Sequence, residues 1–79
     1  MKFDISKVFT AANADNLKIG DKVILADTIE SLKLLVDREA DIELLDYIDG
    51  EYAKDRFYSN NGDSFPLAYL VERASENEE

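Results

Sequence analysis

The 79-residue chain has no cysteine and no histidine, and it contains one proline and three glycines. Without cysteine it can form neither a disulfide framework nor a thiolate metal site, so its fold must rest on packing. Without histidine it lacks the usual general base near neutral pH, and cysteine, the most reactive nucleophile, is missing too. We therefore expect a protein that is not an enzyme and that uses no cofactor.

Long apolar runs are also missing. The longest aliphatic run, Val23 to Ala26, is far shorter than the roughly 20 residues that span a bilayer. In the first seven residues a charged side chain occurs every two or three positions, so they do not form the apolar core of a secretory signal. We expect neither membrane insertion nor secretion, and a reducing cytoplasm suits a chain without cysteine.

Acidic residues are plentiful, and they concentrate in the second half of the chain. Residues 1–40 carry six Lys/Arg against seven Asp/Glu, a net −1, whereas residues 41–79 carry three against eleven, a net −8. The second half also holds six of the eight aromatic residues. Phosphate backbones and anionic lipids repel such a chain, so we predict no direct nucleic-acid or membrane binding and a basic protein surface as partner.

The length limits the organisation to one domain, because a chain of this size buries only about 60% of its unfolded surface and cannot support two cores. We predict an α+β domain over residues 1–73 and a disordered acidic tail over residues 74–79. The three glycines are isolated turn residues, so no phosphate-binding loop is expected. The carboxylates near Gly50 and Gly62 do not match the spacing of a calcium-binding loop, which predicts turns and no metal site.

The central segment predicts a strand followed by a helix. Lys22 to Ala26 is apolar on both faces, which is typical of a strand covered on both sides. Asp27 and Glu30 have the spacing of a capping box, so we expect Asp27 to cap a helix of about ten residues. The apolar positions of that helix recur at helical spacing and should face the sheet: Ile29, Leu32, Leu35 and Val36.

The stretch from Ile42 to Ile48 is ambiguous. Ile42, Leu45 and Ile48 fit one helical face, while Ile42, Leu44 and Ile48 fit one strand face. We favour a strand, because strand patterns over 55–59 and 65–72 follow, with Asn61-Gly62 predicting a type I′ hairpin turn between them. The resulting fold class is one amphipathic helix packed on a mostly antiparallel sheet of four or five strands.

The last of these strands, residues 65–72, is apolar on both faces. One helix cannot cover both sides of a sheet, so either the sheet curls on itself or the second face is an interface with another copy or a partner. Proline cannot donate to a strand ladder, which places Pro66 at a strand start or edge. If the second face is an oligomer interface, its residues are Pro66, Ala68 and Leu70.

The candidate protein-binding surface lies in the acidic half. Its carboxylates have tyrosines among them, so a partner could be steered by charge and anchored by aromatic rings. Such a surface could occupy a basic groove that normally holds nucleic acid; the alternative is that it only keeps the chain soluble. The candidate residues are Asp41, Glu43, Asp46, Tyr47, Asp49, Glu51, Tyr52, Asp55 and Tyr58.

Three strings resemble small uncharacterised proteins encoded by bacteriophages and prophages of Gram-positive bacteria. They are Lys7-Val8-Phe9-Thr10-Ala11 through Asn13-Ala14-Asp15, Gly20-Asp21-Lys22-Val23 with Ala26-Asp27, and Leu67-Ala68-Tyr69-Leu70-Val71-Glu72. The resemblance spans residues 7–72 and carries no functional residue onto this chain. It implies a phage accessory role in the cytoplasm of the bacterial host.

Together these features predict a small acidic protein that binds a basic host protein stoichiometrically, for example by inhibiting a nucleic-acid-binding or defence protein as a nucleic-acid mimic. The alternative is a self-associating structural or accessory module, a homodimer formed through the second apolar face of the sheet.

Overall fold

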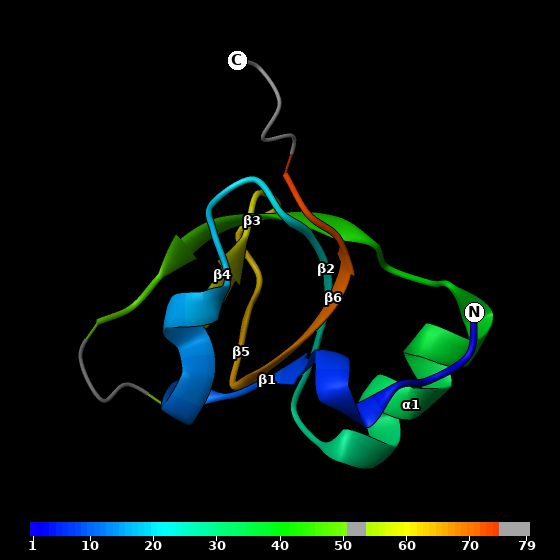
Figure 1. Cartoon of the computed structure of the whole chain (residues 1–79). Coiled ribbons are helices and arrows are strands. Elements are labelled where there is room, and N and C mark those ends of the chain that lie inside the picture. Colours follow the sequence, from blue (N-terminus) through cyan, green and yellow to red (C-terminus); the bar gives the residue numbers. More distant parts are fainter. Residues whose placement is uncertain (51–53, 75–79) are drawn as a thin grey trace.

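The computed structural model describes residues 1–50 and 54–74 (Figure 1). All of its strand pairs are antiparallel, in the order β1-β6-β2-β3-β4-β5. One main helix packs on this sheet, so the α+β prediction is confirmed, with six strands in place of four or five. The elements are the 3-10 helix η1 (Ile5–Lys7), β1 (Val8–Phe9), the 3-10 helix η2 (Ala11–Asn16), β2 (Lys22–Ala26), α1 (Ile29–Arg38), β3 (Glu43–Ile48), β4 (Phe57–Ser59), β5 (Ser64–Phe65) and β6 (Leu67–Glu72).

The antiparallel pair β2–β6 is covered on both faces, as the apolar pattern of 22–26 predicts. Ile24 lies opposite Tyr69, and both belong to the apolar cluster beneath α1. Leu25 lies opposite Ala68, and both belong to a second cluster inside the curve of the sheet. The pair therefore separates two small cores and contributes to each.

Helix α1 covers the first of these cores. Leu32 and Val36 are fully buried against β2 and β6. The prediction that Asp27 caps the helix is wrong: the N-cap is Thr28, whose Oγ1 accepts a hydrogen bond from the Ser31 N–H at 3.1 Å. The helix begins at Ile29, one residue later than a cap at Asp27 requires. Among the described residues, no helix has the length and hydropathy needed to cross a membrane.

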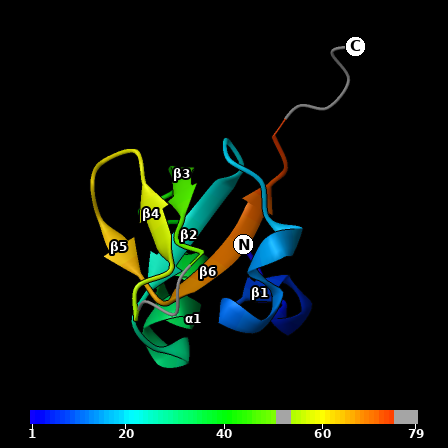
Figure 2. The same ribbon diagram turned by 90° about the vertical axis from the view of Figure 1, so that its left-hand side faces the viewer.

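The second core lies inside the curled sheet. Figures 1 and 2 show β6 bending around it while β3, β4 and β5 continue the curve. Ala68 is fully buried there and Leu70 packs against the same cluster, whereas Pro66 is half-buried at the corner between β5 and β6. Of the two explanations for the second apolar face, the curled sheet is therefore the one that the chain adopts. Ala68 has no surface left for a second copy to contact.

Strand β3 contains a bulge that explains its ambiguous sequence. Leu45 pairs with Ser59 and Tyr47 pairs with Tyr58, whereas Asp46 between them has no pairing partner on β4. The extra residue inverts the alternation, so Leu45 and Ile48 both pack on the interior core although they are three positions apart. The strand prediction is confirmed, but the predicted face is wrong, because Leu44 is 43% exposed.

The loop between β4 and β5 differs from the predicted type I′ turn. The Ser59 N–H donates to the Asp63 carbonyl at 2.8 Å, and the Gly62 N–H donates to the Ser59 carbonyl at 3.0 Å. Of the loop residues 60–62, Gly62 has a positive φ of 92°, whereas a type I′ turn needs two such residues. The loop is therefore a three-residue connection, in which a turn is followed by a left-handed glycine.

Buried Asp21 ties the end of β6 to the start of β2. Its carboxylate accepts the Lys18 N–H at 2.9 Å and the Ala74 N–H at 2.6 Å, and Arg73 Nη1 lies 3.6 Å from it. This hydrogen bond attaches Ala74, the first residue of the predicted tail, to the folded domain. The rest of the predicted tail, residues 75–79, lies outside the described residues.

Candidate protein-binding face and acidic cavity

The predicted acidic surface does not form one continuous site in the structure. Glu51 and Tyr52 lie outside the described residues. Asp46, Tyr47 and Tyr58 lie on the side of β3 and β4 that faces away from the core. Asp41 and Glu43 instead line a cavity on another side of β3. The candidate set therefore divides between two places on the protein.

Asp49 and Asp55 lie near the ends of the β3–β4 connection and make structural contacts. The Asp49 N–H donates to the Arg56 carbonyl at 2.8 Å, and Asp55 Oδ2 accepts from the Ser64 hydroxyl at 3.3 Å. Both residues are half-buried. We assign neither of them to the two sites.

The first site is an aromatic pair on two adjacent strands. Tyr47 on β3 lies opposite Tyr58 on β4, with ring centroids 5.6 Å apart and an interplanar angle of 59°. The bulge at Asp46 places Tyr47 outward, where it is 54% exposed. Cross-strand aromatic pairs stabilise one another, so these rings present an ordered surface rather than two independent side chains.

Apolar residues extend this surface toward the start of β3. Ile42 and Leu44 are both more than two-fifths exposed, and they border a shallow hollow together with Lys22 and Asn61. We call Ile42, Leu44, Asp46, Tyr47 and Tyr58 the outer β3 face. It combines exposed apolar and aromatic groups with an acidic side chain.

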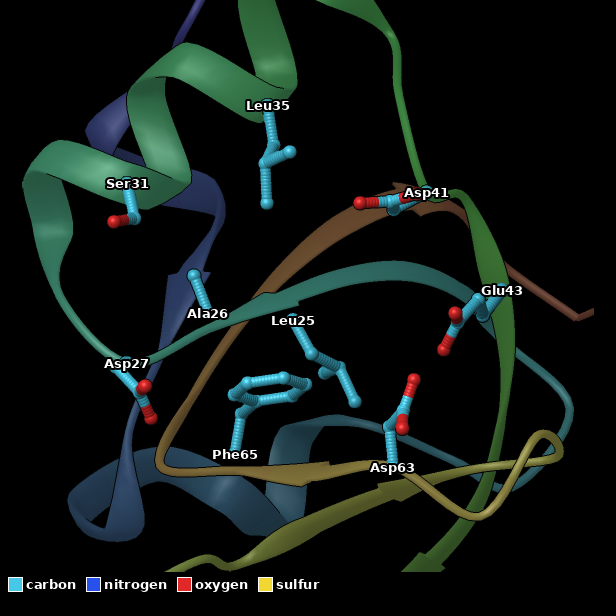
Figure 3. A pocket seen from close by; sticks show the side chains of 9 residues that line it. All are labelled: Leu25, Ala26, Asp27, Ser31, Leu35, Asp41, Glu43, Asp63 and Phe65. Carbon is cyan, nitrogen blue, oxygen red and sulfur yellow. The ribbon is translucent and has the colours of Figure 1, made fainter.

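The second site is a cavity of about 250 Å³ bordered by α1, β2, β3 and β5. It exists because the β2–β3 ladder joins only Lys22 to Leu44 and Val23 to Glu43, after which the two strands diverge (Figure 3). Its lining is largely apolar, with Leu25, Ala26 and Phe65 forming a floor on the strand side and Leu35 facing them from α1.

The cavity has carboxylates at its rim. Figure 3 shows the side chains of Asp41, Glu43 and Asp63 directed toward one side of it, with Asp27 on the opposite side. Asn61 Nδ2 donates to Glu43 Oε2 at 3.0 Å and so orients that carboxylate. Asp41 holds a left-handed backbone, with φ of 58°, a conformation that aspartate tolerates better than most residues.

Sequence reasoning missed Asp27 and Asp63 as members of this site, because it assigned them to a helix cap and a turn. Asp63 reaches Glu43 only through the β3–β4–β5 arrangement, in which the Asn60 N–H donates to the Leu44 carbonyl at 3.0 Å. No local pattern signals that proximity. Within residues 1–50 and 54–74, no group of three or more acidic side chains is placed to hold a metal ion.

Comparison of the chain with protein-family models, curated proteins and solved structures found no match.

Proposed function

We propose that this chain is a small acidic binding protein, encoded by a phage or prophage, that acts without catalysis by stoichiometric binding to a basic host protein. The target class we favour is a nucleic-acid-binding or defence protein whose basic groove the acidic chain occupies. The phage origin rests on the short strings quoted above. The binding role is supported most directly by the Tyr47–Tyr58 pair on the outer β3 face, in which Tyr47 is exposed and Tyr58 is half-buried.

Tyrosines in an ordered, accessible pair suit a binding hot spot. They bring a large contact area at a small loss of side-chain entropy, and tyrosine is among the residues enriched at such positions. The cross-strand contact already orders the two rings before a partner arrives. The net charge of −9 adds long-range attraction to a basic surface and raises the association rate at low salt.

The alternative of self-association through Pro66, Ala68 and Leu70 has no specific observation in its favour. Ala68 is fully buried and Leu70 packs on the interior core. We therefore do not carry it further.

The test is affinity capture from host lysate with the tagged chain, followed by a salt step and mass spectrometry. Three baits are compared: the wild type, Tyr47→Ala/Tyr58→Ala, and Leu34→Ala as control. Leu34 is 57% exposed on α1, away from the tyrosine pair, so the control removes a similar exposed apolar group. We expect the wild type and the control to retain the same basic nucleic-acid-binding protein and the double variant to lose it.

The captured protein is then purified and titrated calorimetrically. Loss of two hot-spot tyrosines should weaken binding at least about 100-fold, and the Kd of the wild type should rise with salt. Equal capture by all three baits, or the absence of any salt-released basic protein, contradicts the proposal.

A further inference from the structure

We propose that the cavity between α1, β2, β3 and β5 binds the side chain of an arginine from the basic partner. This inference rests on the proposed function and deepens it by naming the chemical group that the partner inserts. It places a specific contact at a site separate from the outer β3 face.

The cavity is amphipathic in the way that an arginine side chain is. Leu25 and Leu35 lie where the methylene stem would pack, and both project into the cavity in Figure 3. The ring of Phe65 lies on the floor, where the planar guanidinium group can stack on an aromatic face. A fully hydrated small ion would gain nothing from this apolar floor.

The carboxylates lie on one side of the cavity and come from two segments that are distant in the sequence. Asp41 precedes β3, Glu43 begins it, and Asp63 precedes β5. The described acids are not arranged to hold a metal ion, whereas a guanidinium group has five N–H donors spread over a plane. The hydrogen bond from Asn61 Nδ2 to Glu43 Oε2 helps to hold this carboxylate at the cavity.

The charge of this rim is not neutralised by the chain itself. No lysine or arginine lines the cavity, and among the described residues none of Asp41, Glu43 and Asp63 takes part in an ion pair. Other carboxylates differ: Asp21 faces Arg73, Glu72 faces Lys22, and Glu39 faces the amino terminus. Uncompensated negative charge around an apolar hollow is complementary to a cation that carries an apolar stem.

The inference is tested by titrating the isolated chain with N-acetylarginine amide and measuring the backbone amide NMR shifts. Saturable shifts are expected at the cavity residues, among them Ala26, Glu43 and Phe65, with a Kd of about 1 to 10 mM for a single side chain. The citrulline analogue has the same shape without the charge, and the lysine analogue has the charge without the planar fork. Both should bind at least about five-fold more weakly.

The decisive variants are Asp41→Asn/Asp63→Asn and the charge-matched control Asp15→Asn/Asp37→Asn. Asparagine tolerates the left-handed backbone at position 41, and Asp15 and Asp37 are exposed and do not line the cavity. We expect the first variant to weaken arginine binding at least about ten-fold and the control to change it less than two-fold. Amide spectra of both variants report whether each is folded.

Several outcomes overturn the inference: shifts that do not saturate below about 100 mM, equal binding of the citrulline or lysine analogue, or equal loss in both double variants. Any of these results would contradict the arginine site alone. The proposed function would still be supported if the wild-type bait captures the partner and the Tyr47→Ala/Tyr58→Ala bait does not. Conversely, arginine binding in the cavity together with unchanged capture by that bait would support the cavity and contradict the outer β3 face.

Discussion

The β2–β6 pair and the β3–β4–β5 meander belong to one sheet but are buried very differently. From Val23 to Ala26, every residue of β2 is at most 5% exposed, because α1 covers one face and the curled sheet covers the other. In β3, Leu45 is buried while Leu44 and Tyr47 are largely exposed. The difference shows that, within 79 residues, the β2–β6 pair is buried on both faces while the meander keeps one face exposed to solvent.

The largest effect should come from weakening the two-sided pair. Ile24→Ala removes a fully buried side chain between β2 and α1 and should lower the free energy of unfolding by about 3 kcal/mol. Leu44→Ala on the outer face should change it by less than about 0.5 kcal/mol. Urea denaturation of both variants measures the contrast. Similar losses in the free energy of unfolding would contradict the expectation that β2 contributes more to stability than the outer face of β3.

The next largest loss of stability should come from replacing buried Asp21, which ties the end of β6 to the start of β2. Asp21→Ala leaves the Lys18 and Ala74 N–H groups without their acceptor and removes the ion pair with Arg73, whose Nη1 still donates to the Asn16 carbonyl. Unsatisfied part-buried groups of this kind should cost about 2 kcal/mol of the free energy of unfolding. Thermal unfolding monitored by circular dichroism provides the measurement, with Asp15→Ala as the exposed control. Equal melting temperatures of the two variants would show that the Asp21 contacts are not needed for stability.

A smaller effect is expected at the helix that covers the pair. Thr28→Ala removes the N-cap and should lower the free energy of unfolding by about 1 kcal/mol. Asp27→Ala, at the position that the sequence pattern favoured, should cost clearly less because its side chain is exposed and does not cap the helix. Denaturant titration of the two variants ranks them, and the reverse order would restore Asp27 as the cap.

The meander should respond at its turn. Gly62 has φ of 92°, and a side chain built there meets no neighbour within 4 Å, so Gly62→Ala introduces backbone strain without a steric clash. We expect a loss of about 1 kcal/mol in the free energy of unfolding. Asn61→Ala serves as the comparison because Asn61 does not need a positive φ, although it gives up a hydrogen bond to Glu43. A type I′ turn would instead make both substitutions costly.

The smallest effect concerns the N-terminal segment that packs on this pair. Hydrogen bonds from the Ser6 hydroxyl, and then from its N–H, lower the pKa of Asp4 below the ordinary value of 3.8. Folding therefore favours the charged form of Asp4. Its contribution to the free energy of unfolding is present above pH 3.8 and is lost as the pH falls through the lower pKa of the folded state. NMR titration of the Asp4 carboxyl should show the depressed pKa, and Ser6→Ala should bring it back toward 3.8; an unchanged titration curve would contradict the assignment.

The sequence predicted elements better than it predicted faces. The strand over 22–26, the ten-residue helix and the strands β3 and β4 followed from local periodicity and turn residues. The single strand predicted over 65–72 is instead divided at Pro66 into β5, which pairs with β4, and β6, which pairs with β1 and β2. The inward face of β3 did not, because the bulge at Asp46 changes the period from two to three within the strand. Of the candidate site, Tyr47 and Tyr58 were identified as surface aromatics, but their pairing depends on the register of β3 against β4.

By itself the sequence determined the absence of thiol and imidazole chemistry, the acidic second half, and the strands that are apolar on both faces. These properties are local or compositional, so no tertiary contact can change them. The tertiary structure alone decided that the sheet curls to cover Ala68 and that β2 and β3 diverge after Val23. It also decided that Asp41, Glu43 and Asp63 share one cavity, because packing between distant segments, rather than any short pattern, brings such residues together.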